Sequence, residues 1–301
     1  LVTKKKVLVT GSAGFIATHL SRELRDRGFQ VRTYDIVHGQ DLRDLVRVIG
    51  AVHGVDTVFH LAAIADLNRS RVDPIETMEI NVEGTWNVAY ACWKAGAKLF
   101  YASTCCVYGN QERHPVDENA LPRPAEIYAC SKLAGEYVIQ GFHHTYGLPY
   151  NIMRFATIYG EGTRPALGTH IFFGQALRRE PITVHGDGQQ TRTLTHVDDL
   201  VAGIVALYDS ERLNEVWNLT TEEEVSALGM ARDIRSLVGS LSEIVFVPQR
   251  VGQTFRESIS AEKMRREIGW EAKVKWKEGL ERMKWWYLMD GQVEITYQMP
   301  E

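Results

Sequence analysis

The sequence predicts an α/β protein with a doubly wound parallel sheet, followed by a smaller α/β domain. Short, nearly continuous apolar runs alternate with helical patterns in the first half, as expected for parallel strands buried on both faces. A glycine-rich turn joins the first run to the first helix. After about residue 160 the pattern changes to short strands, helices and longer polar loops. Strand–helix alternation of this kind favours right-handed crossovers between parallel strands.

The elements follow in order from the hydrophobic periodicity and from the glycines that end them. The first half predicts strands at 6–10, 31–35, 56–62 and 98–103, helices at 15–28, 74–96 and about 126–146, and a strand within 150–160. The second half predicts strands at 182–186, 215–220 and 243–248, and helices at about 169–179, 197–209, 225–238, 261–268 and 276–289. We expect a first domain over 1–160 and a second over 161–301, which closes over the carboxyl edge of the first sheet. Some of the second segment is expected to cross back to that sheet.

The composition is that of an ordinary globular protein. Of 301 residues, 45% are hydrophobic and 24% charged, and the net charge is −4 with both signs spread along the chain. Nothing in these values indicates a nucleic-acid or membrane surface. The opening LVTKKK is too short and too basic for a signal peptide, and no apolar run approaches the ~18 residues of a membrane span. Because the four cysteines lack zinc-type spacing, we expect a reduced, cytoplasmic protein with no metal site.

The segment VLVTGSAGFIATHL indicates a dinucleotide site. Gly11 and Gly14 lie between a predicted strand and a predicted helix, where one allows a tight turn and the other allows a pyrophosphate to approach the helix N-terminus. Ala17 stands where a third glycine is usual and adds one methyl group. Asp35 ends the next strand, where a carboxylate accepts hydrogen bonds from ribose hydroxyls and repels a 2′-phosphate. The pattern therefore predicts NAD rather than NADP, against the alternative of a structural turn with a surface aspartate.

A second pattern suggests proton transfer. Tyr128 and Lys132 are four residues apart on a predicted helix and so share one face. A nearby ammonium is expected to lower the pKa of the tyrosine, which suits proton exchange with a sugar hydroxyl. Taken alone, such a pair is ordinarily exposed helix surface. Here it accompanies the glycine turn and a hydroxyl residue, Thr104, at the end of the fourth strand.

Together these motifs resemble an extended short-chain dehydrogenase/reductase, of the NAD-dependent nucleotide-sugar epimerase/dehydratase family similar to UDP-glucose 4-epimerase. The resemblance implies a Rossmann-type NAD-binding domain and a smaller C-terminal substrate domain. It spans nearly the whole chain. The motifs that carry it are TGSAGFIATHL, FHLAA (59–63), NVEGT (81–85), STCCVYG (103–109), YACSK (128–132), RFATIYG (154–160), HGDGQQTRTLTHVDDL (185–200) and RESISAEKMRREIGW (256–270).

The resemblance implies roles for individual residues. Thr104, Tyr128 and Lys132 would be the catalytic set, with Thr104 and Tyr128 bonding the sugar hydroxyl that is oxidised and Lys132 holding the nicotinamide ribose. Tyr108 is expected to be structural. The residues implied to contact NAD are Gly11, Ala13, Gly14, Phe15, Ile16, Asp35, Asp41, Leu42, Leu61, Ala62, Ala63, Asn81, Tyr128 and Lys132.

On the substrate side the resemblance implies a nucleotide sugar, UDP-linked by preference. Arg192 and Arg256 would clamp its diphosphate, for which guanidinium groups are well suited. The chain departs from the family at Thr157, where an asparagine is usual, and at Thr193, where an aspartate is usual. Thr104, Thr157, His170, Arg192 and Arg256 are the expected substrate-binding residues. The resemblance also implies a homodimer through the helices around 75–95 and 125–146.

The resemblance leaves the reaction open. Related 4,6-dehydratases carry Asp-Glu after the catalytic threonine and decarboxylases usually keep a glutamate, whereas this chain has Cys105 and Cys106. A 4-epimerase needs no further acid or base, so 4-epimerisation of a UDP-hexose or UDP-hexuronate is the leading prediction. Alternatively, Cys106 and His170 would exchange protons at C3 or C5 as in related 3,5-epimerases, unless they are packing residues. Reductase, dehydratase or decarboxylase activity and a non-catalytic NAD-binding regulator are the other readings.

Overall fold

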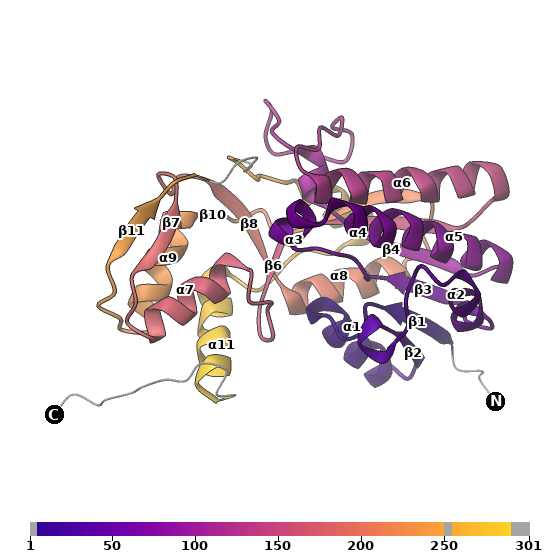
Figure 1. Ribbon diagram of the computed structural model, residues 1–301, viewed down its shortest axis with the longest axis horizontal. Coiled ribbons are helices and arrows are strands. Elements are labelled where there is room, and N and C mark those ends of the chain that lie inside the picture. Colours follow the sequence, from indigo (N-terminus) through magenta and orange to yellow (C-terminus); the bar gives the residue numbers. More distant parts are fainter. Residues whose placement is uncertain (1–4, 250–254, 290–301) are drawn as a thin grey trace.

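The computed structural model describes residues 5–249 and 255–289, and its central layer is a parallel sheet of six strands. The sheet has the order β2-β1-β3-β4-β5-β9 (Figure 1), which confirms the predicted fold class. Its strands are β1 (Lys6–Thr10), β2 (Gln30–Tyr34), β3 (Thr57–His60), β4 (Lys98–Thr104), β5 (Tyr150–Phe155) and β9 (Glu215–Leu219). Most of their side chains are buried because helices cover both faces of the sheet.

Two hydrophobic cores lie on opposite faces of this sheet. On one face, α1 (Phe15–Asp26) and α8 (Val197–Asp209) bury Leu20 and Ile204 against Phe59 and Trp217. On the other, α2 (Leu45–Val52), α5 (Gly84–Ala95) and α6 (Ile127–Tyr146) pack over Val58 and Ile152. The short helix α10 (Glu262–Ile268) places Met264 in the first of these cores. The remaining helices of this part are α3 (Leu67–Val72) and α4 (Pro74–Met78), which precede a π-helical turn over Glu79–Glu83.

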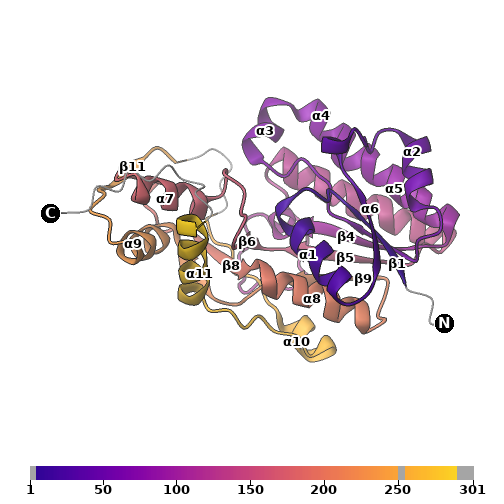
Figure 2. The ribbon, with the colours of Figure 1, turned by 90° about the horizontal axis from the view of Figure 1, so that it is seen from below.

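A second lobe lies beside the main sheet, as Figures 1 and 2 show. It contains the three-stranded sheet β10-β8-β6 and the pair β11-β7. Its strands are β6 (Thr157–Tyr159), β7 (Ile182–His185), β8 (Thr191–His196), β10 (Glu224–Ser226) and β11 (Ile244–Val247). Its helices are α7 (Gly168–Leu177), α9 (Ala227–Leu237) and α11 (Trp276–Met289), which share a core of their own.

The chain crosses between the two lobes several times, so a boundary at residue 160 does not separate them. Residues 197–219 leave the second lobe to form α8 and β9 of the main sheet, and α10 follows later from the same region. The run 150–160 also divides, because β5 pairs with β4 whereas β6 pairs with β8. The helix predicted at 74–96 is present as one continuous helical run, in which a π-helical turn joins α4 to α5.

Candidate active site

A cleft of about 920 Å³ opens at the carboxyl edge of the main sheet, between that sheet and the second lobe. This is where ligands bind in open α/β sheets, because the loops after the parallel strands meet there. The predicted site residues that line it are Gly11, Ala13, Gly14, Phe15, Ile16, Asp35, Asp41, Leu42, Leu61, Ala62, Ala63, Thr104, Cys106, Tyr128, Lys132, Thr157 and Arg192. Of the predicted residues, Asn81, His170 and Arg256 are not among the described residues that line the cleft.

The glycine turn at one end of the cleft has the shape that a dinucleotide requires. Gly11 has φ +66°, and a Cβ there would lie 2.7 Å from the backbone of Ala62, so both conformation and space demand glycine. Gly14 is the N-cap of α1 and its N–H donates to the Gly11 carbonyl at 2.9 Å. The first N–H groups of α1 therefore face the cleft, where they can bind a pyrophosphate. This cradle fits NAD.

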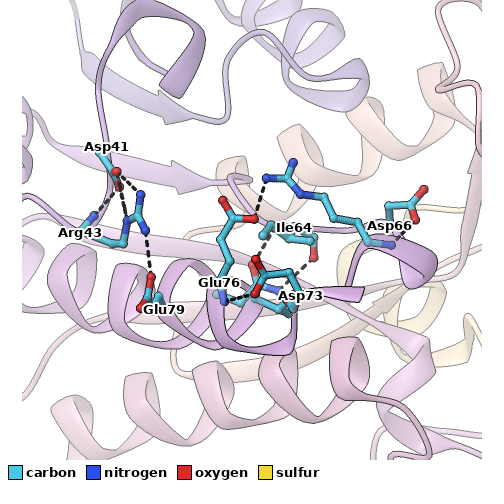
Figure 3. Close-up of polar contacts among 10 residues, drawn as sticks. Asp41, Arg43, Ile64, Asp66, Asp73, Glu76 and Glu79 are labelled. Atoms are coloured by element: carbon cyan, nitrogen blue, oxygen red, sulfur yellow. Dashed lines mark hydrogen bonds and ion pairs between the residues drawn. The ribbon is translucent and has the colours of Figure 1, made fainter. Parts of the chain in front are cut away.

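Asp35 lies at the edge of the cleft beside the glycine turn, and it fixes the local backbone. Its Oδ2 accepts from the Ala13 N–H at 2.9 Å and its Oδ1 accepts from the Val37 N–H at 3.0 Å. The nearby Arg43 guanidinium bridges Asp41 at 2.6 Å and Glu79 at 2.8 Å (Figure 3). Because two carboxylates already engage this arginine, the edge of the site favours ribose hydroxyls over a 2′-phosphate.

The reactive end of the cleft brings together Thr104, Cys106, Tyr128 and Lys132. Thr104 ends β4, and its Oγ1 accepts from the Cys106 N–H at 3.2 Å at the start of a 3₁₀ turn over Cys105–Tyr108. Tyr128 and Lys132 come from the first two turns of α6, as their spacing predicts. The structure therefore gathers the predicted hydroxyl, phenol and amine on one wall.

The electrostatics of this wall differ from the prediction. Burial raises the pKa of Tyr128 above its usual value, although a hydrogen bond with Thr104 acts in the opposite direction. Burial also lowers the pKa of Lys132 to about 7, and its ammonium lies over the Tyr101 ring at 4.1 Å. The expectation that Lys132 lowers the pKa of Tyr128 is thus wrong for this structure, because desolvation dominates both groups.

Asn81 is a positioning residue behind this wall. It is fully buried, and its Oδ1 accepts from the Ile64 N–H at 2.8 Å. Its Nδ2 donates to the Ile64 carbonyl at 3.0 Å and to Ser131 Oγ at 2.9 Å. Because Ser131 precedes Lys132, Asn81 connects the segment after β3 to the helix turn that presents the lysine. It lies near the predicted NAD site but outside the described lining of the cleft.

The predicted substrate residues do not all converge. Thr157 and Arg192 line the cleft. Arg256 is exposed and forms a two-pronged ion pair with Glu224, at 3.0 and 2.8 Å. His170 turns its ring against Tyr287, with centroids 5.4 Å apart. The structure thus places Cys106 in the cleft and His170 against α11, so it does not assemble these two into a facing pair.

Arg164 and Glu257 are among the cleft residues that the sequence did not predict. Arg164, in the loop after β6, donates to the carbonyl of Ala65 at 2.7 Å and so connects the second lobe to the segment after β3. Glu257 is buried beside Thr157 and Thr193. The signal for Arg164 was its place in EGTRPALGTH. Glu257 lies in the motif RESISAEKMRREIGW, but its role could not be predicted because its neighbours come from distant strands.

The described residues contain no helix that combines the length and the apolar character needed to cross a membrane. They also contain no cluster of three or more His, Cys, Asp or Glu side chains suited to a metal ion.

Comparison with known proteins gives consistent matches. A sequence profile of the NAD dependent epimerase/dehydratase family matches residues 7–220. UDP-glucuronic acid decarboxylase 1 from Danio rerio is 32% identical over 300 residues, which cover 93% of this chain and 72% of that protein. UDP-glucose 4-epimerase from Thermotoga maritima, solved with UDP-glucose, has a TM-score of 0.92 at 28% identity and covers 95% of this chain and 100% of its own. A variant of UDP-glucuronic acid 4-epimerase from Bacillus cereus, solved with a UDP-sugar and NAD, has a TM-score of 0.87 at 27% identity and covers 93% of this chain and 98% of its own.

Proposed function

The chain belongs to the NAD dependent epimerase/dehydratase family, and from that premise we propose that it is a nucleotide-sugar 4-epimerase. It is an NAD-dependent enzyme of the group that includes nucleotide-sugar epimerases, dehydratases and decarboxylases. The proposal concerns which of these reactions it catalyses, and the substrate class proposed is a UDP-hexose or UDP-hexuronate. The three relatives named above are each named for a UDP-sugar that they act on or were solved with, which supports that class.

One observation carries the proposal: a phenol and a hydroxyl lie at the reactive end of the cleft with thiols beside them in place of carboxylates. Thr104 and Tyr128 can remove the proton of a sugar hydroxyl, while Cys105 and Cys106 follow Thr104 directly. Burial and the nearby Glu257 raise the pKa of Cys106 to about 11, so it is a neutral thiol at pH 7. A neutral thiol is poorly suited to removing a carbon-bound proton.

The proposed roles follow from these positions. Bound NAD would accept a hydride from C4 of the sugar and return it to the opposite face. Tyr128 would take the hydroxyl proton and give it back, with Thr104 hydrogen-bonded to the same phenol. Lys132, whose pKa of about 7 allows both protonation states near neutrality, would hold the nicotinamide ribose. Arg192 would bind the diphosphate, and Thr157 would contact the sugar nucleotide.

Proton exchange at C3 or C5 by Cys106 and His170 has less support. His170 packs on Tyr287, and burial lowers the pKa of its imidazole. Decarboxylation is the second candidate, because the decarboxylase of Danio rerio is among the matched relatives. One experiment separates all three reactions.

The test is an NMR time course in D₂O with the purified protein and a panel of UDP-, GDP- and dTDP-linked hexoses and hexuronates. We expect a new C4 epimer without deuterium at any ring carbon, and loss of turnover by about 100-fold or more in Tyr128→Phe. Deuterium at C3 or C5 that disappears in Cys106→Ser would support the alternative pair. A UDP-pentose formed from UDP-glucuronic acid would establish decarboxylation, and either result would contradict the proposal.

We also propose a homodimer through α5 and α6. Trp86 is 40% exposed on α5 and Tyr137 is 58% exposed on α6. Trp86 stacks on Tyr90 and also contacts Phe142 of α6, so aromatic surface extends across both helices. Exposed aromatic surface of this kind is typical of interfaces.

Light scattering after size exclusion tests the dimer. We expect a dimer for the wild type and a monomer for Trp86→Glu combined with Tyr137→Glu. Trp285→Glu is the matched control, because Trp285 is an exposed aromatic residue at 60% on α11, remote from this surface. A monomeric wild type at micromolar concentration would contradict the proposal.

A further inference from the structure

Glu257 is a buried acidic side chain in the cleft that the proposed reaction does not use. Its segment pairs with the start of β8, since the Thr191 N–H donates to the Phe255 carbonyl at 3.0 Å and the Glu257 N–H donates to the Thr191 carbonyl at 3.1 Å. This pairing directs the side chain inward, where it lines the cleft and is 7% exposed. The carboxyl group is therefore positioned by backbone structure.

Two hydroxyl groups hold the carboxyl group from one side. Thr157 Oγ1 donates to Oε1 at 3.3 Å and Thr193 Oγ1 donates to the same oxygen at 3.4 Å. On the substrate side, these are the two positions at which the sequence departs from the asparagine and aspartate that the family resemblance implies. Both hydrogen bonds are long, and an ionised carboxylate has about four acceptor positions. The group therefore keeps acceptor capacity for a donor in the cleft.

The charge of this carboxyl group is only partly compensated. Burial raises its pKa, whereas Arg192 and the backbone N–H of Thr157 lower it. Across residues 5–249 and 255–289, no Lys, Arg or His nitrogen lies within ion-pair distance of it. Because a buried carboxylate needs hydrogen-bond donors, the arrangement fits a ligand that supplies one.

Glu257 lies close to the reactive end of the cleft. Its charge helps to raise the pKa of both Cys105 and Cys106, the two residues that follow Thr104. Cys106 and Tyr128 line the same cleft, close enough for their titrations to be coupled. A sugar whose hydroxyl contacts Tyr128 would thus have other ring substituents within reach of Glu257.

We propose that Glu257 determines sugar specificity by accepting a hydrogen bond from a hydroxyl or amino group of the substrate's sugar. The proposal rests on the proposed function only in that a sugar occupies this end of the cleft. A hydrogen bond to a carboxylate is stronger than one to a neutral acceptor. A substituent without a donor, or a carboxylate of the substrate at the same position, would leave a buried negative charge unsatisfied.

The test combines calorimetric binding with kcat/KM for a UDP-hexose, its monodeoxy analogues and its amino analogues. We expect the affinity and the kcat/KM of the wild type to be roughly 10- to 100-fold lower for one deoxy analogue than for the complete sugar. Glu257→Ala should show a similar loss with the complete sugar and no further loss with that analogue, because the two changes remove the same hydrogen bond. The analogue with an amino group at that position should bind the wild type most tightly. Its affinity should also fall by the largest factor in Glu257→Gln.

Glu118→Gln is the matched control, because it removes a partly buried carboxylate that bonds the Asn218 N–H at 2.7 Å outside the cleft. It should rank the analogues as the wild type does. If Glu257→Ala does not fold, Glu257→Gln keeps the shape of the side chain and carries the comparison.

The proposal is overturned if the Glu257 variants rank every analogue as the wild type does. If the wild type binds a UDP-hexose but does not convert it to its C4 epimer, 4-epimerisation is contradicted. The affinities of the analogues still test the role of Glu257 in that case. A wild type that binds no sugar nucleotide would overturn both proposals.

Discussion

Lys132, the proposed holder of the nicotinamide ribose, is a buried amine that we expect to lower the stability of the fold. Its side chain is 2% exposed, and burial lowers its pKa to about 7 from 10.5. At neutral pH the fold therefore carries a partly protonated amine that it would hold more easily without its charge. We expect Lys132→Met to abolish turnover and to raise the free energy of unfolding by about 1–2 kcal/mol.

The sign of the pH dependence follows from the same shift. Below pH 7 the amine is protonated in both the folded and the unfolded state, so the cost of burying its charge reduces stability in full. Between pH 7 and 10.5 the unfolded chain binds more protons than the folded one, so the wild type gains stability and the advantage of the Met variant shrinks. Denaturant unfolding from pH 6 to 9.5 measures this, with Lys277→Met on the exposed surface of α11 as control. A constant difference across that range would contradict the prediction.

Residue types and spacing predicted part of the site. Gly11, Asp35, Thr104, Tyr128 and Lys132 each belong to a local motif beside a strand end, so the order of the elements was enough to bring them to one cleft. His170 and Arg256 do not line the cleft. His170 lies on α7 and packs against Tyr287, and Arg256 pairs with Glu224 on the surface. The directions of both side chains depend on tertiary packing, which local sequence does not show. Glu257 was missed for the same reason.

At the scale of elements, a buried ion pair positions α6 on the sheet. Glu136, one turn after Lys132, binds Arg154 of β5 at 2.6 Å and accepts from Ser103 of β4, and both charged side chains are at least 95% buried. We expect Glu136→Gln to lower the free energy of unfolding by about 3–5 kcal/mol, because Arg154 is left buried without its counter-charge. Glu180→Gln, in the exposed pair with Arg178, should leave stability unchanged. Thermal and denaturant unfolding measure both variants. A loss of stability in Glu180→Gln as large as that in Glu136→Gln would contradict the structural role of the buried pair.

Elements were predicted best where periodicity is long and uninterrupted. The helix predicted at 197–209 corresponds to α8 and that at 276–289 to α11, whereas the short helices α2 and α3 were not predicted. The break between β5 and β6 at Ala156 could not be predicted, because both strands are apolar and only their partners differ. Within the π-helical turn, Asn81 bonds Ile64 and Ser131, which are distant in sequence.

At the scale of the whole molecule, the NAD-binding part is not a segment of sequence. The main sheet needs β9 as an edge strand and α8 as cover, and both follow the first half of the second lobe in the chain. Leu200, Ile204, Trp217 and Leu219 are fully buried in that core. Burial of each such side chain contributes about 1.5–3 kcal/mol, so together they rival the whole stability of a domain, about 5–15 kcal/mol.

We therefore expect a fragment of residues 1–160 to fail to fold, although its sequence contains the glycine turn and the whole predicted catalytic set. Circular dichroism, a denaturant transition and calorimetric NAD binding are the measurements, with the 301-residue chain as the reference. The full chain should unfold in one cooperative transition, because each lobe's connections pass through the other. A fragment that binds NAD and unfolds cooperatively would show instead that β1 to β5 form an independent domain, and that α8 and β9 only extend it.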